Sequence, residues 1–155
     1  MISTAGSAAK AARARELGFE DVVDLSEESL DEGVRRITAG KGVDIVIESI
    51  GGTMTSEALS SLSPGGVLIT LGYSGGRKTT IDVTDLIWKH ARMAGFLLFA
   101  QSPTAIADAW RNILPLIVGG SVKPLVERVY PLCEASEALR HLIEDRPFGK
   151  VILAG

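Results

Sequence analysis

Glycine and hydroxyl residues concentrate in three short segments, each of which follows an apolar run. The segments are residues 3–7 (STAGS), 48–52 (ESIGG) and 71–76 (LGYSGG). Glycine allows a backbone N–H to approach a ligand closely, and N–H groups at the start of a helix hydrogen-bond phosphate oxygens. The three segments therefore predict turns that could bind a phosphorylated ligand.

The first segment favours a phosphate over a ribose diol. A dinucleotide-binding fold commonly carries an acidic residue at the end of its second strand, where the carboxylate accepts hydrogen bonds from the adenosine ribose. Here the hydroxyls of Ser3, Thr4 and Ser7 take that place, and Lys10 follows Gly6 by about one helical turn. This combination suits the 2′-phosphate of NADP better than the diol of NAD. From spacing alone, Lys10 is equally well explained as a solvated surface lysine.

Apolar strands and helices alternate along the chain and position these turns. The expected strands are residues 1–5, 22–25, 43–50, 67–71, 93–99, 125–130 and 150–153. The expected helices are residues 7–17, a helix that Ser26 caps and Gly40 ends, and residues 53–62, 85–90, 103–118 and 134–144. Such alternation is typical of right-handed parallel crossover units. We predict an α/β fold with a doubly wound, mostly parallel sheet, in which the turns meet beyond the carboxyl ends of the strands.

Composition excludes several classes of partner. The chain has 155 residues, of which 46% are hydrophobic, so it can bury the core of a domain. A net charge of −3 with interleaved signs gives no extended positive field, so we expect no nucleic-acid partner. No apolar run reaches the roughly 18 residues that span a bilayer, and no cleavable leader pattern opens the sequence. A single cysteine forms no internal disulfide, which favours the reducing cytoplasm.

Histidine and cysteine do not cluster as metal ligands. His90 and His141 lie far apart in the sequence, and Cys133 stands alone. Structural zinc sites need closely spaced pairs of such ligands, so we predict no metal site. Cys133 is expected to be a small buried residue rather than a nucleophile.

Four longer stretches resemble the medium-chain dehydrogenase/reductases, specifically the zinc-independent branch of quinone oxidoreductases and polyketide enoyl reductases. They are STAGSAAKAARARELGFEDVVDL, AGKGVDIVIESIGG, LSPGGVLITLGYSGG and YPLCEASEALRHLIEDRPFGKVIL. The resemblance covers nearly the whole chain and implies a Rossmann-like fold. It also implies that residues 1–124 are part of a dinucleotide-binding domain, and that residues 125–155 form a strand-helix-strand segment that returns to a substrate domain.

The same resemblance implies a set of residues that bind NADPH. They are Thr4, Gly6, Ser7 and Lys10 at the adenosine 2′-phosphate, Ser49, Ile50 and Gly51 beside the middle of the cofactor, Leu71, Gly72, Tyr73 and Ser74 beside the nicotinamide, and Lys150 in the returning segment. Leu25 departs from the family, whose members often carry a tyrosine near the adenosine. No catalytic residue is assigned. Tyr73 is the best-placed candidate proton donor, although a tyrosine that only packs against the cofactor is the commoner case.

The family's first strand and its glycine-rich pyrophosphate turn match no segment of the chain. The predicted sheet is therefore incomplete at its N-terminal side, and two strands are expected to face one another with unpaired edges. Three explanations stay open. The start codon could be wrongly assigned, a separate chain could supply the N-terminal part, or a truncated remnant could close the gap by moving its strands together.

The resemblance leaves several functions open. The first is an NADPH-dependent reductase of quinones or activated alkenes, present as a fragment with impaired activity alone or as half of a split enzyme. The second is a non-catalytic dimerising or cofactor-binding module derived from such a reductase, and a weaker third is an enoyl-reductase piece of a polyketide or fatty-acid synthase. The low-charge run MAGFLLF should form the far sheet edge. By resemblance to the family, this edge implies a homodimer through Gly95 to Phe99.

Overall fold

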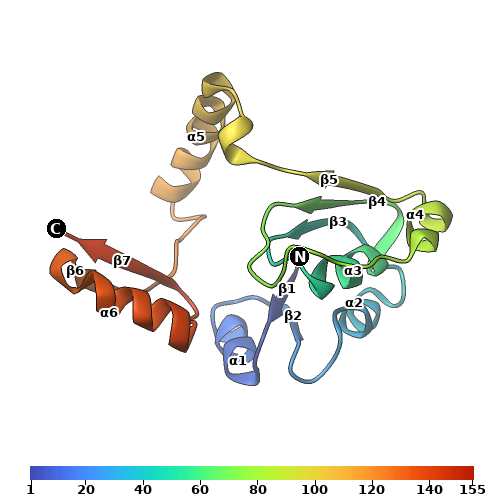
Figure 1. The fold of residues 1–155 in the computed structure, drawn as a ribbon, viewed down its shortest axis with the longest axis horizontal. Helices are drawn as coiled ribbons and strands as arrows, with labels where there is room; N and C mark the ends of the chain where they lie inside the picture. The colour runs from blue at the N-terminus through green and yellow to red at the C-terminus, as the bar shows by residue number, and fades with distance from the viewer. The chain divides into compact units, whose positions relative to one another are not determined.

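A computed structural model describes all residues, 1–155, and divides them into two compact units, residues 1–99 and 100–155. Figure 1 shows the alternation of helices and strands within each unit. All pairings between the strands are parallel, which confirms the predicted α/β class. The predicted boundary after residue 124 concerns the domains of a whole family protein and stays a prediction.

The first unit contains five strands and four helices. The strands are β1 (Ile2–Ala5), β2 (Asp21–Asp24), β3 (Val43–Glu48), β4 (Leu62–Thr70) and β5 (Arg92–Gly95). The helices are α1 (Ala8–Glu16), α2 (Leu30–Thr38), α3 (Thr53–Ser60) and α4 (Val83–Lys89). Successive strands alternate with helices, as the sequence predicts for parallel crossover units.

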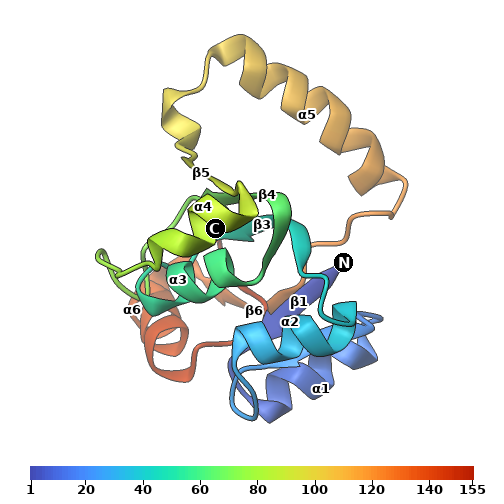
Figure 2. The same ribbon diagram turned by 90° about the vertical axis from the view of Figure 1, so that its right-hand side faces the viewer.

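The five strands form two separate sheets. β1 pairs only with β2, whereas β3, β4 and β5 form a three-stranded sheet in that order. The predicted incomplete sheet is thus observed, with the break between β1 and β3. Helix α2 packs on β2, α3 packs on β3 and β4, and the two helices contact one another (Figures 1 and 2). Residues of α2, α3 and β4 form the apolar core, which contains Leu30, Val34, Ala58, Leu59, Leu62 and Leu68.

Helix α2 begins later than the sequence predicted. Ser29, not Ser26, is its N-cap: the Ser29 hydroxyl accepts from the Glu32 N–H, and the Glu32 carboxylate accepts from the Ser29 N–H. This reciprocal capping box satisfies two N–H groups at once, so it outcompetes an isolated serine. Ser26 instead donates its N–H and hydroxyl to Asp24 at the end of β2.

Two strand boundaries also differ from the prediction. Pro64, Gly65 and Gly66, which were predicted to form a turn, lie within β4. The pairing of β4 with β3 is irregular there, since its register shifts between Val43 and Ile45 of β3. A bulge accommodates these residues without ending the strand. β5 ends at Gly95, and the apolar run predicted to continue it enters a short 3₁₀ turn at Leu98–Ala100.

The second unit consists of a long helix and a parallel strand pair. Helix α5 spans Pro103–Val118 and begins at Ser102, whose hydroxyl accepts from the Ala105 N–H, as predicted for a serine followed by proline. Figure 2 shows the length of this helix. Strands β6 (Val126–Pro131) and β7 (Lys150–Ala154) pair in parallel and are connected through α6 (Ala135–Arg140). Tyr130 of β6 is the largest fully buried side chain of this unit.

Candidate functional site

A buried carboxylate organises the carboxyl ends of β3 and β4. Glu48, the last residue of β3, is only 3% exposed. One carboxylate oxygen accepts the N–H groups of Ile50 and Gly51, the latter at 2.7 Å. The other accepts the hydroxyls of Thr55 at 3.0 Å and Thr70 at 3.2 Å. Burial raises the pKa of Glu48, but the four donated hydrogen bonds outweigh it, so the net pKa lies below the ordinary value and the group is ionised at neutral pH.

The two predicted loops at these strand ends pack directly against one another. The Gly75 N–H donates to the Ile50 carbonyl at 2.6 Å, and the Gly52 N–H donates to the Gly76 carbonyl at 3.0 Å. A Cβ on Gly72 would overlap the Ser49 carbonyl. Position 72 therefore requires glycine so that the two backbones can approach closely. The loops 49–52 and 71–76 pack together as a result.

This pair of loops borders a hollow of about 470 Å³. Its wall includes the predicted residues Gly51, Leu71, Gly72 and Tyr73. Helix α3 begins at this wall with Gly52 as N-cap and no side chain capping it, so its first N–H groups have no side-chain partner. Such N–H groups carry partial positive charge, which favours an anionic ligand group.

Two cations at this hollow were missed from the sequence. Arg77 and Lys78 line it, and the Arg77 guanidinium lies 5.5 Å from the centre of the Tyr73 ring. Both residues directly follow the predicted loop 71–76, so this basic pair was the sequence signal that could have added them to the candidate site. A cation pair beside an uncapped helix N-terminus gives the hollow a positive character that suits a phosphate or another anion.

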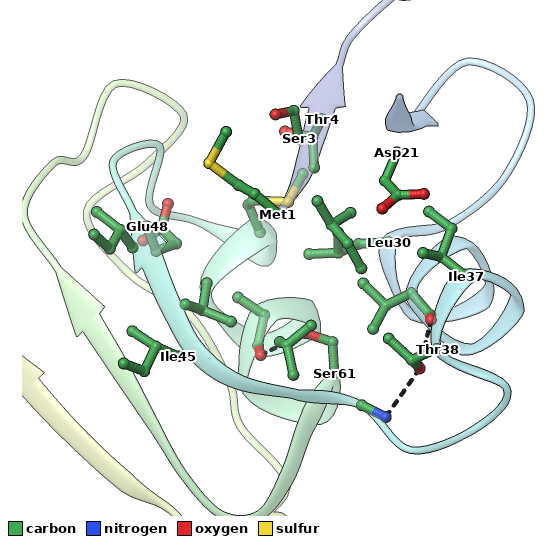
Figure 3. Close-up of a pocket in the computed structure, with 18 of the residues that line it drawn as sticks. Met1, Ser3, Thr4, Asp21, Leu30, Ile37, Thr38, Ile45, Glu48 and Ser61 are labelled. Carbon is green, nitrogen blue, oxygen red and sulfur yellow. Dashed lines mark hydrogen bonds between the residues drawn. The ribbon is translucent and has the colours of Figure 1, made fainter. Parts of the chain in front are cut away.

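The predicted residues of the first loop lie at the end of β1. Thr4 and the β3-end residues Ser49 and Ile50 line a second, larger groove of about 870 Å³, so both strand ends border the same space (Figure 3). Ser7 is the N-cap of α1, and its hydroxyl accepts from the Lys10 N–H at 3.4 Å. Gly6 has open space around the position of a Cβ. The structure thus brings Thr4, Ser49 and Ile50 to one groove, whereas Gly6, Ser7, Lys10 and Ser74 line neither hollow.

The remaining candidates lie elsewhere. Lys150 begins β7 in the second unit, whereas all the other predicted cofactor residues belong to the first. Cys133 was expected to be buried and is exposed, because it lies in a 3₁₀ turn at Leu132–Glu134 rather than inside a helix.

No group of three or more His, Cys, Asp or Glu side chains is placed to hold a metal ion. None of the helices combines the length and apolar character that crossing a bilayer requires.

Comparison with known proteins gives consistent matches. The profile of a family described as zinc-binding dehydrogenase matches residues 17–153. Quinone oxidoreductase-like protein 2 of Bos taurus is 28% identical, and the alignment covers 99% of this chain and 45% of that protein. The 2-haloacrylate reductase of a Burkholderia species is 26% identical over 99% of this chain and 47% of its own length.

Solved structures agree with these matches. A crystal structure of 2-haloacrylate reductase superposes with a TM-score of 0.84 at 28% identity, covering 99% of this chain and 49% of that one. An NAD-dependent alcohol dehydrogenase superposes with a TM-score of 0.81 at 30% identity, covering 99% of this chain and 43% of that one. The chain therefore spans about half the length of the relatives it matches. The chain corresponds to the C-terminal part of quinone oxidoreductase-like proteins, which are medium-chain dehydrogenase/reductases. The profile match over most of the chain, together with the Rossmann-like parallel fold, shows that the chain belongs to the zinc-binding dehydrogenase family.

Proposed function

We propose that this chain forms the nicotinamide-dinucleotide-binding part of an NADPH-dependent reductase of quinones or activated alkenes. The observation that carries the proposal is the joined pair of loops after β3 and β4, which Glu48 organises beside a positively charged hollow. Two relatives support the reaction class by name, a 2-haloacrylate reductase and a quinone oxidoreductase-like protein. Glycine backbone, the N-terminus of α3 and two cations border the same hollow, and this combination supports the binding of an anionic cofactor.

Each loop has a distinct role in holding the cofactor. Thr4, Ser7 and Lys10 would hold the adenosine 2′-phosphate, because hydroxyls and an ammonium donate hydrogen bonds and no carboxylate follows β1. Ser49 to Gly51 would lie beside the middle of the cofactor. Gly72 and Tyr73 would flank the nicotinamide.

When bound, the nicotinamide supplies a hydride, and the protein has to orient the ring and stabilise the oxygen that gains charge on the substrate. Arg77 lies over the Tyr73 ring and its guanidinium can provide such stabilisation. We assign Tyr73 to packing against the nicotinamide rather than to proton transfer. A Tyr73→Phe variant should therefore keep turnover within about threefold of wild type in a complete enzyme, whereas loss of a general acid would cost about 10²-fold or more.

Titration of the chain with NADPH and with NADH, followed by nicotinamide fluorescence, tests the cofactor proposal. Lys10→Met should weaken NADPH binding about 5- to 10-fold, since a partly exposed charge-assisted contact contributes roughly 1–1.4 kcal/mol, and should leave NADH binding unchanged. Lys41→Met removes an exposed lysine that lines neither hollow and serves as the control. Equal affinity for both cofactors in wild type, or equal loss for both in Lys10→Met, would contradict the NADP assignment.

A second candidate is a non-catalytic dimerising or cofactor-binding module. It is favoured because the chain matches less than half of each of these relatives, so the activity of the whole relatives does not carry over to the chain directly. The module predicts NADPH binding without quinone-dependent NADPH oxidation. Measured turnover by the pure chain would exclude it, whereas binding without turnover would favour it over an independent enzyme.

The homodimer remains part of the proposal. β5 is the outer strand of its sheet, all four of its residues are exposed, and Phe99 just beyond it is 92% exposed. An unpaired strand edge followed by exposed apolar residues favours pairing with a second copy. Sedimentation should show a dimer that Phe99→Lys shifts toward monomer.

We further propose that activity needs no zinc, so that chelator treatment leaves the activity unchanged. We also propose that the protein acts in the reducing cytoplasm.

A further inference from the structure

We propose that the hollow beside the joined loops binds the carboxylate of an α,β-unsaturated carboxylic acid through Arg77 and Lys78. The inference names the substrate class of this site and rests on the proposed reductase function. It selects a charged activated alkene over a neutral quinone. All residues that line the hollow lie between Gly51 and Leu97, within one compact unit, so their relative positions are defined.

The two cations of the hollow have no anionic partner in the chain. Arg77 and Lys78 are exposed, and neither side chain forms an ion pair with the protein. Arg77 instead lies over the Tyr73 ring, which leaves its N–H groups available for a bidentate bond to a carboxylate. No Asp or Glu lines the hollow. Its charged wall therefore favours an anionic ligand group.

The backbone N–H groups of the joined loops are already used within the protein. Those of Ile50 and Gly51 donate to Glu48, and those of Gly52 and Gly75 donate to carbonyls of the facing loop. These four groups offer no free donor to an anion. Recognition of an anionic ligand in the hollow falls instead to the two cationic side chains.

Another part of the wall is apolar. Leu71, Phe96 and Leu97 line the hollow and are exposed, so a hydrocarbon group that covers them is bound favourably. The volume of about 470 Å³ lies in the range of small-molecule sites, about 300–1,000 Å³. A ligand with a hydrocarbon part and an anionic head satisfies both parts of the wall. Inorganic phosphate lacks the first, and a quinone lacks the second.

Reduction of such a substrate also makes use of two positive charges. A C–H bond forms at the carbon β to the carboxylate with a hydride from NADPH, which is oxidised to NADP⁺. The π electron pair of the C=C bond moves toward the carboxylate, which gains a second negative charge, and a solvent proton then forms the C–H bond at the α carbon. Arg77 and Lys78 can compensate the charge that is present at the start and the charge that develops.

Titration of the ¹⁵N-labelled full chain with crotonate and with crotonamide, followed by amide NMR, tests the proposal. The two probes share the conjugated alkene and differ in charge. Crotonate should bind at least about fivefold more tightly and shift the amide signals of Gly72 and Lys78, since two exposed ion pairs contribute about two- to fivefold each. Acetate and inorganic phosphate, which lack the alkenyl chain, should bind at least about threefold more weakly than crotonate.

Charge-removing variants locate the binding site. Arg77→Gln and Lys78→Gln should each weaken crotonate binding about threefold and leave crotonamide binding unchanged. Arg77→Lys keeps the charge and should retain most of the affinity. Lys41→Gln removes an exposed lysine that lines neither hollow and should change nothing. The amide spectrum of each variant shows directly that it stays folded.

Addition of NADPH separates this inference from the proposed function. Crotonate should bind equally well at saturating NADPH. Displacement of crotonate by NADPH would assign the two cations to the cofactor and overturn the inference. Equal affinity for crotonate and crotonamide would overturn it too, as would acetate or phosphate binding as tightly as crotonate, which would indicate an adventitious anion only.

The two proposals can also fail one at a time. NADPH binding without selective crotonate binding would refute the carboxylate site and leave the cofactor proposal intact. Selective crotonate binding without NADPH binding would support the carboxylate site and refute the cofactor proposal.

Discussion

Replacing Glu48 should separate the charge of this residue from its hydrogen bonds. In Glu48→Gln, the amide oxygen can still accept from the N–H groups of Ile50 and Gly51, and the amide nitrogen can donate to the oxygens of Thr55 and Thr70. Only the extra strength of charge-assisted bonds is lost, so we expect destabilisation of about 1–2 kcal/mol. Glu48→Leu leaves two buried N–H groups without an acceptor, at about 1–3 kcal/mol each, so we expect about 3–5 kcal/mol.

The pH dependence of stability should follow the same carboxylate. Because the folded pKa of Glu48 lies below its ordinary value of 4.5, its contribution is complete above that pH and is lost as pH falls through the folded pKa. The difference in unfolding free energy between wild type and Glu48→Gln should therefore be largest near neutral pH and shrink below about pH 4.5. The difference should not change between pH 6 and 8.

Denaturant unfolding followed by circular dichroism measures these free energies. Glu127→Gln, which neutralises an exposed carboxylate of β6, is the matched control and should change stability by less than about 0.5 kcal/mol. The reasoning fails if Glu48→Leu is as stable as Glu48→Gln, since the argument assigns most of the cost to unpaired N–H groups. It also fails if the gap between wild type and Glu48→Gln is independent of pH.

Three other substitutions test the local structure. Gly72→Ala should destabilise by at least about 2 kcal/mol and weaken NADPH binding, because the added Cβ overlaps the Ser49 carbonyl; Gly6→Ala, with open space around it, should be neutral in the same unfolding assay. Ser29→Ala should cost about 1 kcal/mol in thermal unfolding through loss of the α2 capping box, and a cost below about 0.3 kcal/mol would show that the box is not formed. Thr70→Val should cost about 1 kcal/mol by denaturant titration, and no change would show that its bond to Glu48 is negligible.

The sequence by itself determined the class of fold and the places where the glycine-rich loops occur. Apolar runs such as 43–50 and 67–71 predict parallel strands buried on both faces. These runs became β3 and β4, but β3 is not buried on both faces, since Ile45 and Ile47 are exposed. Glycines predicted the loops because only glycine permits the close approach seen at Gly72. The family also followed from the sequence, since the quoted stretches extend over nearly the whole chain.

Only the tertiary structure decided which polar side chains act on those loops. In the sequence, Glu48 lay within the strand predicted over residues 43–50. Its role depends on donors from Thr55 and Thr70, which meet it only when β3, α3 and β4 pack. The choice of Ser29 over Ser26 as helix cap was local by contrast, because Ser29 and Glu32 form a capping box whose pattern the sequence carries. The division into two sheets required coordinates as well: β1 pairs only with β2, β3 pairs with β4, and α2 and α3 contact one another.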